Sequence, residues 1–537
     1  MKGDYSRDTF DPTRHFSRVL MQQGRVQVDA DWNEQASILL HYLRSLAVDL
    51  IGSDGGPAGN LGFGIELPED KIENLTIAEG HYYVDGILCE NEGPQNYYRQ
   101  PNYPLDPKKK DGDKLPDQLP FLVYLDVWER HITAIEEPAI QEVALEGPDT
   151  TARAMVVWQA RVVTKSDIPG LGASDFDPVN FTCSGFEETN LWTLLKGWLQ
   201  PEQRGRMAAK AQEPDEEPKD VCIVSPEARY RGAENQLYRV EIHKRGKAGE
   251  ATFKWSRENG AVVFPIELVA DKSVTLENLG RDDRFGLEVG DWVEVIDNIY
   301  VGRGRTKDLL RVTVIDAIDR LITLSDAPTY GHDPNARPLL RRWDQQRGYP
   351  DSADLEKSGG AVVITEDEWI SLEDGIQVKF DAGQTYRSGD YWLIPARTVT
   401  GNVEWPKANE EPLALPPHGV DHHYAPLAIV SLDGGKTKIA DLRHSFSPYG
   451  SCCPTIAVIS DKATVFSGNT IKFTARISRP DSNLKYHWSV TGGNLTTVAG
   501  ESIVATATTQ GTLVATVVVE GLPPGCSNTA MSACDVQ

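Results

Sequence analysis

The sequence predicts a mainly β, multi-domain protein that carries one amphipathic helix near its N-terminus. Three observations support this fold class. Short runs of alternating apolar and polar residues recur along the chain, Asp-Gly and Asn-Gly pairs follow several of these runs, and a long helical spacing of leucines occurs close to the N-terminus. With 537 residues, 40% of them apolar, the chain is large enough for about three or four domains of roughly 150 residues each.

The predicted helix lies within residues 19–52, VLMQQGRVQVDADWNEQASILLHYLRSLAVDLIG. We expect Asp31 to cap its N-terminus, with Glu34 completing a capping box, and Gly52 to end it. Leucines at helical spacing define one apolar face, and Ser37, His41 and Arg44 lie on the other. So short a helix is unstable alone, so either the domain behind it or a partner subunit must cover the leucine face. We predict partner docking through Trp32, Leu39, Leu43, Leu46 and Leu50.

Strand and turn signals extend over most of the remaining chain. Residues 75–90 read as a β-hairpin that turns at Asp85-Gly86, and Asn259-Gly260 predicts a second hairpin turn. Residues 287–325 have the short strands of a small SH3-like barrel. The strands after residue 454 recur at the spacing of an immunoglobulin-like (Ig-like) sandwich, with Trp488 where that fold buries a tryptophan. This tail resembles the polycystic-kidney-type Ig-like domains.

These signals divide the chain into six parts. They are a docking segment with the helix at 1–60, a β domain with the hairpin at 61–165, an insertion or long loop region at 166–230, a β domain with the barrel at 231–345, a further β domain at 346–450, and the Ig-like domain at 451–537.

Composition excludes some partners and compartments. A net charge of −25 argues against binding to nucleic acid or to an anionic membrane surface. The sequence contains no apolar run of signal-peptide or membrane-spanning length, so we expect assembly in the cytoplasm. The seven cysteines include no CxxC pair. Disulfides would form only in an oxidising medium, among the four that bracket the last domain: Cys452, Cys453, Cys526 and Cys534.

The candidate chemical sites are weak. His418, His422 and His423, with Asp421, are the best metal candidates, but their place in a turn before a strand favours packing and hydrogen bonding. Asp29 and Asp31 form an Asp-x-Asp pair without a complementary motif. The carboxylates between Glu136 and Asp149 could supply a glycosidase pair by chance alone. Because no nucleophile, phosphate or metalloprotease motif is found, we expect no catalytic residue, metal or cofactor.

Several stretches resemble a known group of proteins. The pattern I-x-x-G-x-x-Y-V-D-G is similar to one in phage tail-fibre and baseplate-associated proteins; here it consists of Ile77, Gly80, Tyr83, Val84, Asp85 and Gly86. Four segments resemble an uncharacterised bacterial family found alongside contractile-tail baseplate components: residues 1–35, 125–150, 251–263 and 422–428. The likeness covers residues 1 to about 450. It implies membership of a contractile injection system and no catalytic residue.

We therefore expect a non-enzymatic structural component of such a phage-tail-like particle, at the baseplate periphery or as a fibre or cage-like attachment. Its expected partners are other baseplate and tail proteins, together with copies of itself in a trimer or hexamer, and release of the particle would place it outside the cell. The alternative is an adhesin or carbohydrate-binding protein that attaches to a cell-surface glycan, as the tryptophans and the Ig-like tail suggest. A hydrolase that uses the acidic cluster is a third reading.

Overall fold

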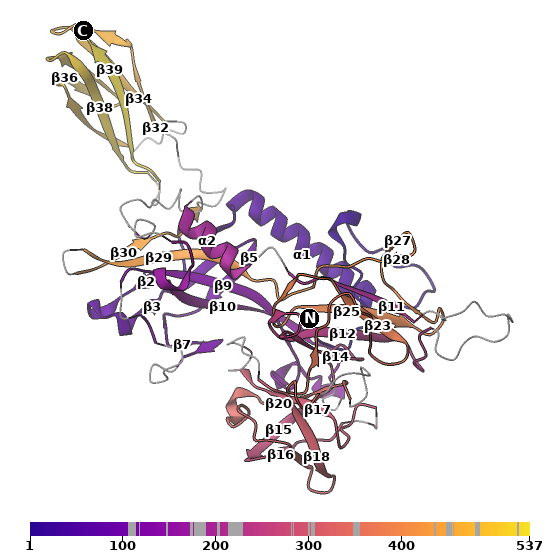
Figure 1. The fold of residues 1–537 in the computed structure, drawn as a ribbon. Coiled ribbons are helices and arrows are strands. Elements are labelled where there is room, and N and C mark those ends of the chain that lie inside the picture. The colour runs from indigo at the N-terminus through magenta and orange to yellow at the C-terminus, as the bar shows by residue number, and fades with distance from the viewer. Residues whose placement is uncertain are drawn as a thin grey trace. The chain divides into compact units, whose positions relative to one another are not determined.

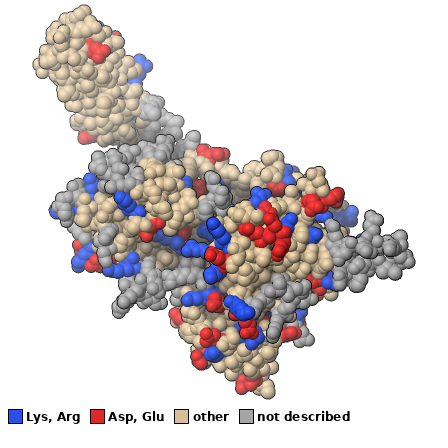
Figure 2. All heavy atoms as spheres, viewed as in Figure 1, with Lys and Arg blue, Asp and Glu red and all other residues tan. Residues whose placement is uncertain are grey.

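The computed structural model describes residues 1–105, 114–116, 119–145, 149–171, 176, 189–200, 204–212, 229–280, 282, 284–298, 301, 307–346, 355–433, 436–446, 454, 456–477, 484–522 and 526–537. The chain forms two compact units. The larger unit contains residues 1–55 and 62–444, and the smaller one contains residues 56–61 and 445–537. Figure 2 shows acidic and basic side chains interspersed over the larger unit on the face in view.

A five-stranded antiparallel sheet lies at the centre of the larger unit (Figure 1). Its order is β21 (Val362–Val363), β14 (Thr252–Ser256), β12 (Gln236–Lys244), β25 (Tyr391–Arg397) and β26 (Asn402–Val403). Beside it lies a sheet of β11 (Met207–Ala211), β23 (Ile376–Phe380) and β22 (Ile370–Ser371). One aromatic core fills the space between them, and Tyr238, Trp255 and Trp392 are among its fully buried side chains.

A second long sheet joins strands that are far apart in sequence. Its order is β10 (Arg153–Thr164), β9 (Phe121–Ile132), β29 (His423–Asp433) and β30 (Lys436–Asp441). The short helix α2 (Asn190–Leu199) packs Leu191, Trp192 and Leu195 into the apolar core of this sheet. Most of the predicted insertion at 166–230 lies outside the described residues.

The expected barrel is present and is larger than predicted. Six strands close in the order β15 (Val263–Ala270), β16 (Ser273–Leu276), β19 (Leu321–Leu324), β18 (Leu310–Asp316), β17 (Trp292–Ile296) and β20 (Leu339–Trp343). Asn259 and Gly260 both have positive φ, as the predicted turn requires. The turn does not close a hairpin, however, because β14 and β15 belong to different sheets.

The YVDG hairpin is confirmed: β4 (Gly80–Val84) pairs with β5 (Ile87–Asn91), and Asp85 and Gly86 have φ values of 46° and 76°. β1 (Asp54–Pro57) pairs with β4. The remaining short strands of this unit are β2 (Ile65–Glu66), β3 (Thr76–Ile77), β6 (Gln95–Asn96), β7 (Arg99–Gln100), β8 (Tyr103–Pro104), β13 (Gly246–Lys247), β24 (Thr385–Tyr386), β27 (Lys407–Ala408) and β28 (Glu411–Pro412).

The smaller unit is a two-sheet sandwich. One sheet contains β32 (Ile456–Ser460), β34 (Thr470–Ile477), β37 (Ser502–Ala507) and β36 (Gly493–Ala499). The other contains β33 (Thr464–Val465), β39 (Thr529–Val536), β38 (Gly511–Glu520) and β35 (Lys485–Thr491). Residues 56–57 also pair with β31 (Ser445–Phe446). Trp488 is half-buried, and its indole nitrogen donates to the Gly500 carbonyl at 3.0 Å.

The cysteines near this sandwich differ in state. Cys526 is disulfide-bonded, whereas Cys534 is a buried free thiol. Cys452 and Cys453 lie outside the described residues.

The predicted division of the larger unit at residues 345 and 346 separates strands that pair with each other. Strand β25 pairs with β12, and β29 pairs with β9. Local patterns identify such strands but not their partners, because pairing across hundreds of residues depends on tertiary contacts. No helix among the described residues has the length and apolar character needed to cross a membrane.

Candidate docking surface

The N-terminal helix, α1 (Asp29–Ile51), begins three residues earlier than a cap at Asp31 would place it. Val28 occupies the N-cap position without a side-chain hydrogen bond, so the prediction that Asp31 caps the helix is wrong. Asp31 instead lies inside the first turn with Asp29, where their negative charges favour the positive end of the helix dipole. Gly52 ends the helix with a φ of 100°, as predicted, and its N–H donates to the Val48 carbonyl at 2.8 Å.

The face of α1 that lies opposite the leucines packs against the body of the larger unit. Ile38 is buried, and the Arg44 guanidinium pairs with the Glu129 carboxylate at 2.9 Å. The Asp85-Gly86 turn packs closely against the same face, because a Cβ on Gly86 would lie 2.4 Å from the Arg44 carbonyl oxygen. The body of the chain therefore covers the face that the sequence describes as the more polar one.

The leucine face is open to solvent. The exposed fractions are 77% for Trp32, 53% for Leu39, 62% for Leu43, 55% for Leu46 and 57% for Leu50. Of the two possible covers predicted for this face, the domain behind it does not provide one. Exposed apolar side chains are ordinary when scattered, but a contiguous row of them marks an interaction surface.

The exposed apolar surface is larger than the sequence analysis predicted. Two further side chains of α1, Leu40 and Tyr42, are exposed. The segment that leads into the helix adds five more: Phe16, Leu20, Met21, Val26 and Val28. Their concentration within thirteen residues was a signal in the sequence, but without a regular period it does not show which side chains face solvent.

Polar contacts fix α1 to the N-terminal segment. The Ser6 N–H and hydroxyl donate to the Asp29 carboxylate at 2.8 and 2.6 Å. The Thr9 hydroxyl donates to Glu34 at 2.6 Å, and the Val19 N–H donates to the Gln35 side chain at 2.8 Å. These bonds join the helix to the N-terminal segment, and the Arg44–Glu129 pair joins it to the body, so the leucine face is presented in a defined orientation.

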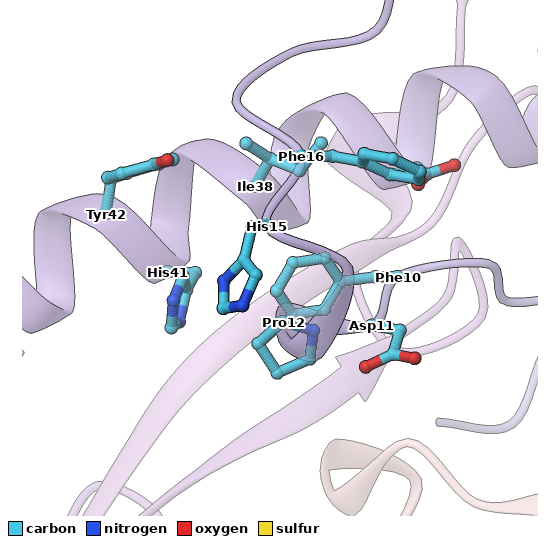
Figure 3. A pocket seen from close by; sticks show the side chains of 9 residues that line it. Phe10, Asp11, Pro12, His15, Phe16, Ile38, His41 and Tyr42 are labelled. Carbon is cyan, nitrogen blue, oxygen red and sulfur yellow. The ribbon is translucent and has the colours of Figure 1, made fainter.

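A small pocket of about 190 Å³ opens between this N-terminal segment and α1 (Figure 3). Phe10 and His41 lie with their ring centres 5.9 Å apart, and Ile38 and Tyr42 contribute from the helix. The pocket is smaller than the roughly 300–1,000 Å³ typical of sites for small organic ligands.

The predicted metal candidates do not converge. His422 Nδ1 lies 2.6 Å from Asp126, and His423 Nδ1 lies 2.9 Å from Asp85. The His418 ring packs against the Tyr391 ring. Each histidine thus has its own neighbour, and the described residues contain no group of three or more histidine, cysteine or carboxylate side chains suited to a metal.

The acidic candidates also have local structural partners. Glu136 pairs with Arg130 and accepts a hydrogen bond from the Thr133 N–H, while Glu137 and Glu142 accept hydrogen bonds from backbone N–H groups two residues on. Glu146 lies outside the described residues. Of the seven tryptophans considered for sugar stacking, five lie in cores and are buried, namely Trp128, Trp158, Trp255, Trp292 and Trp392, whereas Trp369 and Trp405 are partly exposed.

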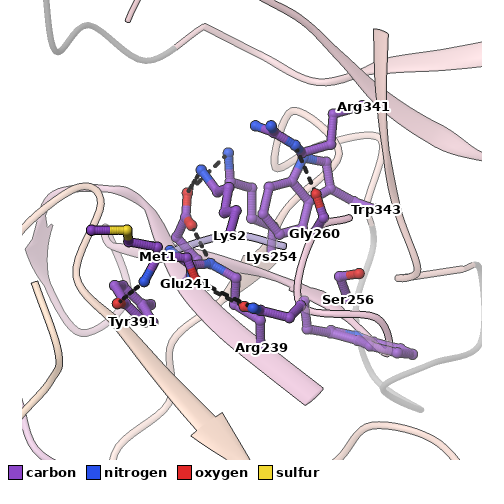
Figure 4. Close-up of polar contacts among 12 residues, drawn as sticks. Met1, Lys2, Arg239, Glu241, Lys254, Ser256, Gly260, Arg341, Trp343 and Tyr391 are labelled. Atoms are coloured by element: carbon purple, nitrogen blue, oxygen red, sulfur yellow. Dashed lines mark hydrogen bonds and ion pairs between the residues drawn. The ribbon is translucent and has the colours of Figure 1, made fainter. Parts of the chain in front are cut away.

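Sequence reasoning missed a buried cluster of charges at the start of the chain (Figure 4). The Met1 amine donates to the Tyr391 hydroxyl at 2.6 Å. Glu241 lies 3.1 Å from Lys2, 2.6 Å from Arg239 and 3.5 Å from Lys254. Burial raises the pKa of Glu241, but the three surrounding cations outweigh it and hold that pKa well below its usual range. Glu241 is therefore ionised and neutralises neighbouring cations inside the core.

Comparisons with known proteins give a family and little more. A family of unknown function, DUF6519, matches residues 1–171 and 199–464. Among curated proteins, none matches the chain.

Three solved structures are similar at 11–13% identity. The mouse nectin-like molecule 4 ectodomain (Ig1–Ig3) is 13% identical over 50% of this chain and 94% of that one, with a TM-score of 0.13. A polysaccharide lyase is 11% identical over 64% and 41%, with a TM-score of 0.12. The Escherichia coli adhesin FdeC is 12% identical over 51% and 95%, also with a TM-score of 0.12. Scores this low carry no argument about function.

Proposed function

The chain belongs to the DUF6519 family, and we propose that it is a non-enzymatic structural component of a contractile injection system. In this proposal it is held at the baseplate periphery, or as a fibre or cage-like attachment, through α1 and the segment before it. The observation that carries the proposal is the exposed leucine face of α1, supported by polar contacts on its other side.

The energetics of that face favour a docking role. Seven large apolar side chains of α1 are each about half exposed or more. Because full burial of one such side chain is worth about 1.5–3 kcal/mol, covering the exposed part of all seven would contribute roughly 5–10 kcal/mol before the entropy cost of association. A ring-shaped machine with many copies would multiply even a modest contact into firm attachment.

The resemblance of four segments to proteins found alongside baseplate components supports the choice of machine. A body of β sheets, a barrel and a sandwich suits a rigid part that holds its neighbours. In this proposal the chain assembles in the cytoplasm as part of the particle and reaches the exterior with it after release. Its partners are other baseplate and tail proteins, together with copies of itself.

The test is particle incorporation of a folded surface variant. Deleting residues 1–52 would also remove Met1 and Lys2 from the buried cluster, so substitution is the sharper change. We expect the double variant Leu43→Glu with Leu46→Glu to fold and to be lost from purified particles. Ser45→Glu adds a negative charge at an exposed position of α1 outside the leucine face, and it should be incorporated normally. Normal incorporation of the double variant would overturn the proposal.

The alternative proposal is an adhesin or carbohydrate-binding protein. Burial of five of the seven tryptophans reduces one of its two supports to Trp369 and Trp405, and the sandwich unit is the other. A glycan array probed with the full chain decides this alternative. Binding to a defined glycan would favour it, and binding to none would leave it without support.

A further inference from the structure

The exposed face of α1 has the spacing of a helix-to-helix seam. Its outward residues are separated by alternating steps of four and three positions, which is the spacing of the a and d positions of a heptad repeat. All six are exposed: Trp32, Ala36, Leu39, Leu43, Leu46 and Leu50. A seam of this kind is normally covered by another helix, because each a or d side chain inserts between four side chains of the facing helix.

The chain itself holds the seam outward. Ala30 and Ile38 are buried on the opposite side of α1, and Arg44 is paired with Glu129. The helix is about 35 Å long, at 1.5 Å for each of its 23 residues. A second helix can therefore lie along the full seam without displacing the contacts that fix α1 to the body.

We infer that the occupant of this seam is α1 of a second copy of the chain, packed antiparallel. An antiparallel pair centred on residue 41 places every a position opposite a d position. Leu39 then faces Leu43, the small Ala36 faces Leu46, and Trp32 at one end faces Leu50 at the other. The seam is complementary to itself, as a two-fold interface requires.

The charges along the helix allow this approach. The six positions that flank the seam are Asn33, Gln35, Leu40, Tyr42, Ala47 and Asp49. Of these side chains only Asp49 is charged. Two copies therefore meet without a row of like charges. Arg25 precedes the first turn of α1, Asp29 and Asp31 lie within that turn, and Asp49 lies in the last turn, so both signs of charge occur at the leading end and the a-to-d register sets the direction of packing.

The inference rests on the docking role proposed for α1, and it names the partner at that face. The full chain at tens of micromolar should sediment with at least twice its 59.3 kDa mass. The Leu43→Glu/Leu46→Glu variant should lose the α1 contact and have at most half the wild-type mass, whereas Ser45→Glu should match wild type. Unchanged circular dichroism of the double variant excludes misfolding as the cause.

A disulfide experiment tests the direction of packing and does not depend on the charged variant. Chains carrying Ala36→Cys and chains carrying Leu46→Cys should form a cross-linked dimer on mild oxidation when mixed, but not separately. Wild-type chain controls for the natural cysteines. A cross-link in each single variant alone would contradict the antiparallel register.

The outcomes separate this inference from the proposed function. A monomeric wild-type chain, or an oligomer that the double glutamate variant leaves intact, overturns the second copy as the occupant. Loss of the double variant from particles would, in that case, still support docking of α1 to another protein of the machine.

Discussion

The N-terminal segment contains two arrangements that are each unfavourable in isolation: charged groups buried in the core, and apolar side chains exposed to water. Met1 and Lys2 bring two amino groups into the charged core around Glu241, whereas α1, less than thirty residues later, holds a row of leucines in water. The two arrangements differ in whether the chain itself supplies the groups that compensate them. The buried charges are matched within the chain, by Glu241 and by the Glu294 carboxylate 2.8 Å from Lys254. The described residues provide no cover for the leucines.

This contrast shows which surface depends on another molecule. A buried ion pair that is fully partnered is complete in the isolated chain, and removing one member leaves an uncompensated charge. An exposed row of apolar side chains contributes to stability only when another surface covers it and removes it from water. Substitutions in the first region should therefore change folding, and substitutions in the second should change association.

The largest expected effect is at Glu241. Replacing it with Gln leaves Lys2, Arg239 and Lys254 around a neutral amide, so we expect unfolding to become easier by about 3–5 kcal/mol. Urea denaturation of the purified chain measures this. Glu404→Gln is the matched control, because Glu404 is a more exposed carboxylate that pairs with Arg397 at 3.0 Å, and it should cost less than about 1 kcal/mol. Equal losses in both variants would contradict the account.

Acid should weaken the same buried region. Burial, with the Lys254 charge adding to it, lowers the pKa of His243 to about 4. Between pH 4 and 6.5 the folded state therefore binds fewer protons than the unfolded state, so stability falls as the pH drops through that range. At pH 5 the loss from this one group is about 2 kcal/mol. Denaturation midpoints at pH 7 and pH 5 should differ less for His243→Gln than for wild type, and an unchanged difference would argue against this assignment.

The contact that seats α1 on the body is tested at Gly86. Gly86→Ala combines a φ of 76° with a new carbon 2.4 Å from the Arg44 carbonyl oxygen, so we expect a loss of about 1–3 kcal/mol. Gly383 has a φ of 71°, and a Cβ added there would have no heavy atom within 4 Å, so Gly383→Ala reports backbone strain alone. Thermal unfolding compares the two. If Gly383→Ala costs as much, the contact with α1 contributes nothing measurable.

The smallest expected effect on folding is at the leucine face itself. Leu39→Ala should change the stability of the dilute chain by less than about 0.5 kcal/mol, because Leu39 is mostly in water. Leu122→Ala, at a fully buried position near the start of β9, should cost about 2–5 kcal/mol. Urea denaturation at nanomolar concentration, where association is suppressed, measures both. A large loss at Leu39 would mean that the chain itself covers this face.

Local sequence patterns predicted the local structure well. The Asp85-Gly86 turn, the barrel strands, the sandwich strands and the end of α1 at Gly52 each depend on a few neighbouring residues. The start of α1 was misplaced because Asp31 fits a capping motif, but a motif does not show whether the side chain is used as a cap.

Long-range features were not predictable in the same way. The contact of Lys2 with Glu241 joins positions 239 residues apart, and nothing local to either residue indicates the other. For α1, the leucine spacing identified an apolar face, but periodicity does not show whether the chain covers it. The arrangement of His418, His422 and His423 was also not predictable, because residues close in sequence need not direct their side chains to one point.

The central claim is that the leucine face of α1 is covered by another protein chain in the assembled state. Hydroxyl-radical footprinting of Trp32, Leu43 and Leu46 tests it most directly, with the reactivities in the assembly compared with those in the dissociated chain. The account predicts several-fold protection of these three side chains and none at Val399, which is 94% exposed on the larger unit. Equal reactivity of the leucine face in both states would contradict it.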